Sequence, residues 1–188
     1  MKDSATVHSP ATHTTALVAS VLLSALFPAP DAIAEEKIKN GNFENLDCII
    51  GSSVGCPDWD MTGNAAVHGD GRDGKGATVG GLGPGAGTVT QKRLNLAVGN
   101  YAFSFSYRPA GTNLFGETAA IVKIGKRTVF AEMLRTIGTG QASYKKYQVF
   151  LMIYERDKGE QDVQFFAEES PNFAGPLFQI DDVSLVGP

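Results

Sequence analysis

Alternation of apolar and polar residues is the clearest pattern in this chain, and it is strongest between residues 101 and 107. Every second residue there is aromatic, and alanine or serine stands at each position between. Because successive side chains of a β-strand point to opposite faces, this period of two predicts a strand with one aromatic, buried face. Similar runs predict further strands at 88–96, 119–124, 128–134, 147–154, 162–167 and 178–185.

Glycine, proline and charged residues mark the turns between these runs. Residues 125–127 separate two runs that together predict a β-hairpin. Residues 157–160 predict another turn, and Pro171 and Pro176 break the chain before the last run. The glycine-rich stretch 63–87 predicts a long loop with tight turns. No stretch keeps a helical period, so the chain predicts an all-β fold, a two-sheet antiparallel β-sandwich.

The last run changes the face of its apolar residues halfway along. With strict alternation, Phe178 and Ile180 share one face, whereas Val183 and Leu185 share the other. A one-residue bulge at Asp181–Asp182 would return all four apolar side chains to the core. Such a bulge also draws at least one carboxylate away from the solvent, which costs free energy unless donors or a cation satisfy it.

A third carboxylate, Glu44, lies near the start of the predicted mature chain. The first and last strands of many sandwiches are neighbours, so Glu44 is expected to meet Asp181 or Asp182. Carboxylates that meet repel one another unless a cation bridges them, which predicts a structural Ca2+ with these three residues as side-chain ligands. The alternative is that the aspartates accept backbone N–H bonds or pair with a lysine such as Lys37 or Lys39.

Two terminal motifs carry a resemblance to a known group of domains. Asn40–Glu44, Trp59 and Ile180–Leu185 resemble the corresponding parts of galactose-binding-like jelly-roll domains, a group that includes many carbohydrate-binding modules. The resemblance implies a β-sandwich of jelly-roll type. It also implies a module that binds sugars, adheres to other molecules or is purely structural, because this fold carries all three.

Some of the predicted strands are apolar on both faces, as in 147–154, where each face carries three large apolar side chains. One set must build the core, and the other is predicted to bind a ligand. The predicted ligand-binding residues are Phe130, Phe150, Met152, Tyr154 and Phe166. Three occupants of this face are open: the chain's own loops, a carbohydrate or another protein. A carbohydrate is the main prediction, with polar neighbours such as Arg108, Asn113 and Gln148 orienting its hydroxyls.

The first 34 residues are predicted to be a secretory signal peptide. The apolar run at residues 16–27 is too short to span a bilayer comfortably, and Ala32–Ala34 follows the A-x-A cleavage pattern. Lys2 is accompanied by Asp3, so the positive charge before the run is weak, and a disordered leader or a buried helix is the alternative. Residues 35–188 then form a single domain without a membrane span, secreted or periplasmic.

The two cysteines of the chain, Cys48 and Cys56, both follow the predicted leader. In an oxidising compartment the simplest prediction is a disulfide between them. The alternative, a metal site, is weak because two cysteines without a nearby histidine are a poor set of zinc ligands.

Charge and motifs narrow the function further. The chain carries a net charge of −4, which gives no reason to expect a nucleic-acid partner. Gly51–Gly55 matches G-x-S-x-G and Gly69–Gly74 matches G-x-G-x-x-G, but neither lies between a strand and a helix. A catalytic pair of carboxylates that are remote in the sequence, such as Glu132 and Glu168, stays open as an alternative.

We predict a non-catalytic binding module for carbohydrate or cell-surface glycan. The alternative is an extracellular structural or adhesive protein that uses the same apolar face.

Overall fold

A computed structural model describes residues 34–54, 56–80, 87–109, 117–135, 142–168 and 178–188. Contacts divide the chain into residues 1–31 and 32–188, and every described residue belongs to the second unit. The predicted signal peptide lies outside the described residues, apart from Ala34, and stays a prediction. The elements are β1 (Glu35–Glu36), β2 (Asp60–Gly63), β3 (Ala66–His68), β4 (Gly76–Val79), β5 (Gly87–Leu96), β6 (Gly99–Pro109), β7 (Glu117–Ile124), β8 (Arg127–Arg135), β9 (Lys145–Ile153), a 3-10 turn η1 (Glu155–Asp157), β10 (Gly159–Glu168) and β11 (Phe178–Gly187).

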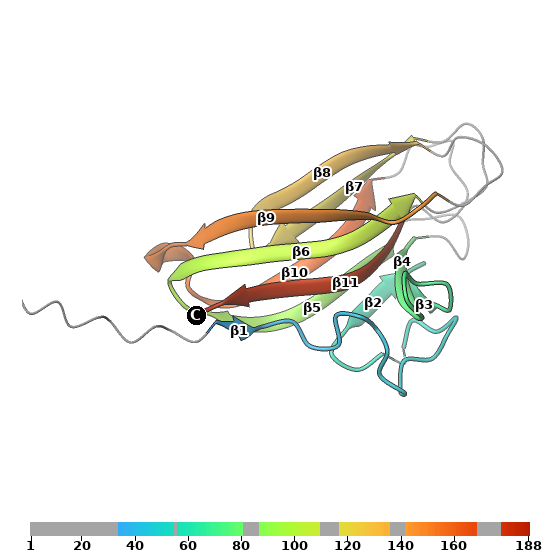
Figure 1. The fold of residues 1–188 in the computed structure, drawn as a ribbon, viewed down its shortest axis with the longest axis horizontal. Helices are drawn as coiled ribbons and strands as arrows, with labels where there is room; N and C mark the ends of the chain where they lie inside the picture. The colour runs from blue at the N-terminus through green and yellow to red at the C-terminus, as the bar shows by residue number, and fades with distance from the viewer. Residues whose placement is uncertain (1–33, 55, 81–86, 110–116, 136–141, 169–177) are drawn as a thin grey trace, which may run out of the picture. The chain divides into compact units, whose positions relative to one another are not determined.

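The strands form two antiparallel sheets that pack face to face (Figure 1). The first sheet has the order β3-β4-β11-β6-β9, with β1 beside β11, and the second has the order β2-β5-β10-β7-β8. The predicted two-sheet antiparallel β-sandwich is therefore confirmed. The described residues contain no helix that is long and apolar enough to cross a membrane.

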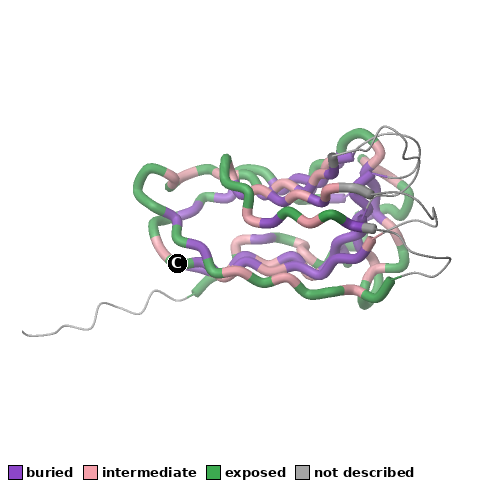
Figure 2. Tube along the Cα trace, turned by 90° about the horizontal axis from the view of Figure 1, so that it is seen from above, coloured by how far each residue is buried: buried purple, intermediate pink, exposed green. Residues whose placement is uncertain are grey.

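Buried residues lie along the strands of both sheets (Figure 2). The core lies between the sheets, and the alternating aromatics of β6 belong to it. Phe103 and Phe105 are fully buried, as the period of two predicted. Phe105 packs edge-on against Phe165 of the second sheet, with ring centroids 5.2 Å apart. Burying side chains of this size stabilises the fold by about 1.5–3 kcal/mol each, so the aromatic face of β6 holds the two sheets together.

The bulge predicted in the last strand is present. Asp181 pairs with Ser106 and Ser184 pairs with Ser104, so β11 has one extra residue at this point. Asp182 takes a positive φ of 50°, which turns the strand. The four apolar side chains of β11 that the sequence placed in two phases are all buried, at 0–4% exposure.

The two ends of the domain lie side by side, as predicted from the terminal motifs. Glu35 pairs with Gly187 in the β1–β11 ladder, and farther along the Val183 N–H donates to the Gly41 carbonyl at 2.9 Å. The Cys48–Cys56 disulfide is formed, which confirms that prediction. Both half-cystines are buried. The bond closes the loop between residues 48 and 56.

One prediction about the strands is wrong. Residues 63–87 were predicted to be a loop, but β3 and β4 lie within them and pair with each other, and β4 also pairs with β11. Short strands rich in glycine and alanine give a weak alternation signal, because few of their side chains are large enough to mark a face.

Candidate ligand-binding site

The five residues predicted to form one ligand-binding face do not share a face. Phe130 of β8 is only 7% exposed and belongs to the core. Its ring packs edge-on against Phe105, Tyr107 and Tyr147, at centroid distances of 5.2, 5.0 and 4.8 Å. A ligand on the surface has no access to this ring, so the inclusion of Phe130 is wrong.

Phe166 lies on the other side of the sandwich. It follows the fully buried Phe165 in β10, so its side chain projects from the outer face of the second sheet. The ammonium group of Lys123 lies 4.8 Å from the centre of its ring. Phe166 therefore lies on the opposite sheet from Phe150, Met152 and Tyr154 and does not share a face with them.

The remaining three residues do form a continuous surface, which we call the β9 strip: Phe150, Met152 and Tyr154. Their exposed fractions are 76%, 38% and 52%, and they alternate with the buried Leu151 and Ile153. The strip lies on the outer face of the first sheet, on its last strand. Because these side chains are exposed, the loops that the structure describes do not bury this part of the face. Residues 81–86 and 110–116 of the loops in that alternative lie outside the described residues.

The strip leads into a pocket of about 540 Å³, which we call the β9-end pocket. Met152 and Tyr154 of the strip line it together with Lys126 and Arg127 of the β7–β8 turn. The residues around the rest of the pocket are Ile124, Leu151, Ile153, Arg156, Asp157 and Gln161. Apolar side chains thus alternate here with groups that can form hydrogen bonds.

The β7–β8 turn is held in place beside β9. Gly125 has a φ of 55°, where a side chain would be strained, and a Cβ there would overlap the Gln161 side chain. Its N–H donates to the Asp162 carbonyl at 2.8 Å. Arg127 Nη1 donates to the Met152 carbonyl at 3.4 Å and so links the turn to the strip. One backbone hydrogen bond and one side-chain hydrogen bond therefore connect this turn to β10 and β9.

Charged groups in the pocket are mostly basic. Arg156 Nε lies 3.5 Å from Asp157 Oδ2, and the Arg156 guanidinium lies 5.6 Å from the centre of the Tyr154 ring. Among the described residues, Lys126 and Arg127 have no carboxylate partner. The pocket therefore presents two cations that are not neutralised.

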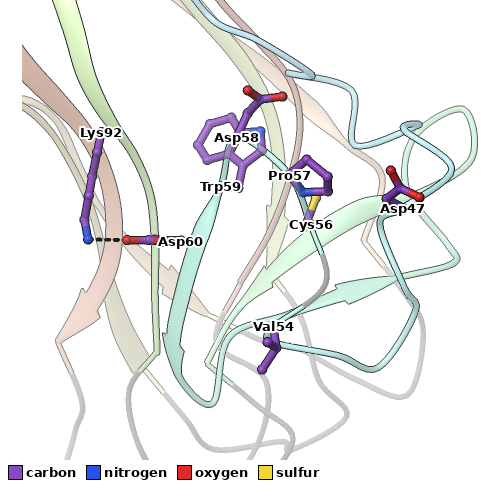
Figure 3. A pocket seen from close by; sticks show the side chains of 8 residues that line it. All are labelled: Asp47, Val54, Cys56, Pro57, Asp58, Trp59, Asp60 and Lys92. Carbon is purple, nitrogen blue, oxygen red and sulfur yellow. Dashed lines mark ion pairs between the residues drawn. The ribbon is translucent and has the colours of Figure 1, made fainter.

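A second pocket of about 500 Å³ lies beside the disulfide (Figure 3). Trp59 lines it but is only 5% exposed, and its indole packs against Phe43 at a centroid distance of 5.0 Å. Lys92 pairs with Asp60 across one wall (Figure 3). This pocket offers polar groups without an exposed ring on which a sugar could stack.

The predicted metal ligands Asp181 and Asp182 lie at the bulge and are satisfied by protein donors. Asp181 Oδ2 accepts the Arg72 N–H and Oδ1 accepts the Asp182 N–H, both at 2.7 Å. Asp181 is 2% exposed, and burial raises its pKa from the ordinary 3.8 to about 6. Asp182 Oδ2 pairs with Arg72 Nη1 at 2.7 Å and accepts the Ser106 hydroxyl at 3.0 Å.

Glu44 meets the same loop, residues 71–75, from the other end of the chain. It accepts the N–H of Lys75, and a Cβ at Gly74 would overlap its carboxylate. A Cβ at Gly71 would lie 2.9 Å from Asp181 Oδ2. Within the described ranges, no group of three or more His, Cys, Asp or Glu side chains is placed to hold a metal ion. The alternative of N–H and cationic partners is observed, with Arg72 in place of a lysine.

A polar network on the outer face of the first sheet was missed by the sequence analysis. The Arg108 guanidinium donates to Gln179 Oε1 at 2.5 Å and to Asp70 Oδ2 at 2.8 Å, and it stacks on the Tyr144 ring at 4.5 Å. His68 Nδ1 lies 2.5 Å from Asp70 Oδ1. Burial lowers the pKa of His68. These residues come from distant segments, and no spacing in the sequence connects them.

The remaining predictions concern the polar residues expected to orient a sugar and the remote pair of carboxylates. Arg108 is 8% exposed and engaged in this network, so it is not placed to orient a ligand on the β9 strip. Gln148 is exposed on β9, and Asn113 lies outside the described residues. Glu132 accepts the Tyr107 hydroxyl, and the side chain of Glu168 is not among those that the structure describes.

Comparison with known proteins identifies the fold. No family model matches this chain, and no curated protein matches it. Among solved structures, TmCBM61 in complex with β-1,4-galactotriose is similar, with a TM-score of 0.51 and 15% identity over 80% of this chain and 97% of that chain. The apo form of a cyclase from Fischerella sp. has a TM-score of 0.50 and 15% identity over 81% and 96%. A CBM35 from Paenibacillus barcinonensis has a TM-score of 0.45 and 11% identity over 82% and 98%.

These similarities concern the fold. A carbohydrate-binding module and a cyclase share the architecture, so any function has to be argued from the residues of the site. The chain is similar in fold to both of these proteins, and its fold is the predicted β-sandwich of jelly-roll type.

Proposed function

We propose that this protein is a secreted, non-catalytic module that binds carbohydrate through the β9 strip and the β9-end pocket. The observation that carries the proposal is the exposed row of Phe150, Met152 and Tyr154, which leads into a pocket of about 540 Å³. Soluble domains rarely leave large apolar side chains together on the surface without a partner. The similarity of the fold to a module solved with a galactotriose supports the choice of carbohydrate as that partner.

The chemistry of the strip suits a sugar. A pyranose ring has an apolar C–H face that packs against an aromatic ring and hydroxyls that need hydrogen-bond partners. Tyr154 supplies a half-exposed ring, and Gln161 and Asp157 supply polar groups in the adjoining pocket. Phe150 and Tyr154 are separated by about 13 Å along the strand, which is long enough for an oligosaccharide. The pocket volume lies in the usual range for small-ligand sites, about 300–1,000 Å³.

Absence of catalysis is part of the proposal. Most glycoside hydrolases use two carboxyl groups on either side of the scissile bond. Among the residues that line the β9-end pocket there is one carboxylate, Asp157, and Arg156 lies against it. The disulfide and the predicted leader support an oxidising, extracytoplasmic compartment.

Calorimetric titration with sugars chosen from a glycan array tests the proposal. Tyr154→Ala should lower affinity by roughly 5- to 30-fold, or about 1–2 kcal/mol, because the ring supplies much of the contact area. Phe166→Ala, an aromatic truncation on the opposite sheet, is the matched control and should leave affinity unchanged. Both variants should melt within a few degrees of the wild type. An array without binding, or equal losses in the two variants, would refute the proposal.

A structural Ca2+ at Glu44, Asp181 and Asp182 remains part of the proposal. Its support is that the bulge and the first segment bring these carboxylates to one loop, residues 71–75. The fit is incomplete, because N–H and guanidinium donors now face the oxygens, and they would have to turn away to admit a cation. Melting in EDTA, followed by addition of Ca2+, tests the ion. A bound ion predicts a lower melting temperature after chelation and recovery on addition.

A further inference from the structure

We infer that the β9-end pocket selects carbohydrates that carry an anionic group, with a carboxylate as in uronic acids as the expected group. The inference rests on the proposed carbohydrate-binding function and adds the class of sugar. It is carried by the two unneutralised cations of the β7–β8 turn, Lys126 and Arg127, which line the same pocket as Tyr154.

The positive charge of the pocket is local. The chain as a whole carries a net charge of −4, so a basic pocket does not follow from a basic composition. Of the four charged residues that line it, only Asp157 is acidic, and Arg156 neutralises it at 3.5 Å. Lys126 and Arg127 have no carboxylate within ion-pair distance among the residues that the structure describes. A neutral sugar has no charge that could pair with these two cations, whereas an anionic sugar would form ion pairs with them.

Arg127 is positioned for this role. Its Nη1 donates to the Met152 carbonyl at 3.4 Å, which holds the side chain against the β9 strip. A guanidinium has five N–H donors in a planar fork, so one bond to a carbonyl leaves donors for a ligand. A fork of this kind binds a carboxylate with two parallel hydrogen bonds. The expected arrangement has the sugar ring on Tyr154 and its acidic group toward Arg127.

Lys126 adds charge without a fixed direction. It occupies the exposed corner of the β7–β8 turn, next to Gly125, and it lines the same pocket. A flexible ammonium group at this place attracts an anion over several ångströms and tolerates different linkages of the sugar chain. The two residues together therefore favour the charge class of the ligand, while the β9 strip provides the apolar contact.

The test compares three ligands by calorimetric titration at about 20 mM and about 300 mM salt, where charge pairs are weakly and strongly screened. Trigalacturonic acid is the carboxylate probe, its methyl ester is the neutral match, and a sulfated galactose trisaccharide tests the other common anion of glycans. Preference for either anionic sugar over the ester supports the inference and identifies the anion. The preference should be roughly three- to tenfold at low salt, because exposed charge pairs each contribute modestly, and it should shrink at high salt.

Variants locate the effect. Lys126→Gln combined with Arg127→Gln should reduce binding of the acid to the level of the ester, and it should weaken binding of the acid several-fold more than binding of the ester. Lys39→Gln, an exposed lysine next to the Gln91 side chain of β5, is the matched control and should keep the preference. If the double variant melts at a lower temperature, Lys126→Gln alone should still remove part of the preference.

The outcomes separate this inference from the proposed function. Equal binding of the acid, the sulfated sugar and the ester would overturn the charge selection and leave carbohydrate binding standing. A preference that survives in the double variant would overturn its assignment to this pocket. Binding of no sugar of either class would overturn both.

Discussion

The buried carboxylate at the bulge of β11 makes a signed prediction about pH and stability. Burial raises the pKa of Asp181 from 3.8 to about 6 in the folded protein. Between these two values the folded state binds the proton more tightly than the unfolded state. The free energy of unfolding should therefore fall as the pH rises from about 4 to about 6, and the stabilisation by the neutral carboxyl is present only at lower pH. A shift of about two units corresponds to about 3 kcal/mol.

Asp181→Asn isolates this contribution. The amide cannot ionise, so the variant lacks this part of the pH dependence. It keeps one oxygen acceptor where the carboxylate has two, so it loses either the Arg72 N–H bond or the Asp182 N–H bond, a pH-independent cost of about 1–3 kcal/mol. The prediction is therefore made for the pH dependence: the stability of the variant minus that of the wild type should rise by about 2–2.5 kcal/mol from pH 4 to pH 7, because part of the full effect lies below pH 4.

Urea denaturation at intervals across this range, in EDTA, measures the difference. If the difference in free energy of unfolding between the variant and the wild type stays constant with pH, the raised pKa of Asp181 is refuted. The argument that burial disfavours the ionised form of this carboxyl is then refuted as well.

Calcium supplies the second arm of the experiment. A bound cation favours the ionised carboxylate, so saturating Ca2+ should reverse the slope of the wild type and leave the variant little changed. Identical curves in EDTA and in Ca2+ would refute the proposed ion.

Three further predictions concern the core, the disulfide and the leader. Phe130→Ala should lower the free energy of unfolding by about 3–5 kcal/mol in urea denaturation, since its ring is enclosed by three aromatic neighbours; a loss below about 1 kcal/mol would mean that the ring is not enclosed. Cys48→Ser should cost about 2–3 kcal/mol, and thiol titration of the denatured wild type should find no free thiol. Exported protein should begin at Glu35 by intact mass, and a mature chain that starts at Met1 would contradict the predicted cleavage.

The strands that the sequence predicted best are those with large side chains at every second position. In β6 four aromatics mark one face, and the phase change in β11 even located the bulge at Asp181–Asp182. β3 and β4 were missed, because glycine, alanine and threonine occupy most of their positions and mark neither face. The alternation that predicts a strand depends on side-chain size. A small side chain gains little free energy on burial and loses little on exposure, so either face of the strand accepts it.

The apolar face that we propose to bind carbohydrate was predicted only in part, and the reason is geometric. Alternation shows that Phe165 and Phe166 point in opposite directions, and likewise Phe130 and Val129, but not which of the two points inward. Phe130 turned out to be core and Phe166 to project from the other sheet, whereas the β9 strip was identified correctly as a second apolar row. To know which side chains face the core, one must know which strands belong to each sheet. That assignment depends on pairings between residues that are distant in the sequence.

The class of fold, the Cys48–Cys56 pairing and the position of the bulge could all be predicted from the residues, because each depends on side-chain size, polarity or spacing along the chain. Two features could not: Arg72 as the partner of the bulge carboxylates, and the pocket that Lys126 and Arg127 share with Tyr154. Charges and hydrogen-bond donors act over a few ångströms in space. Their partners are set by how strands stack in the two sheets, a relation that local periodicity does not encode.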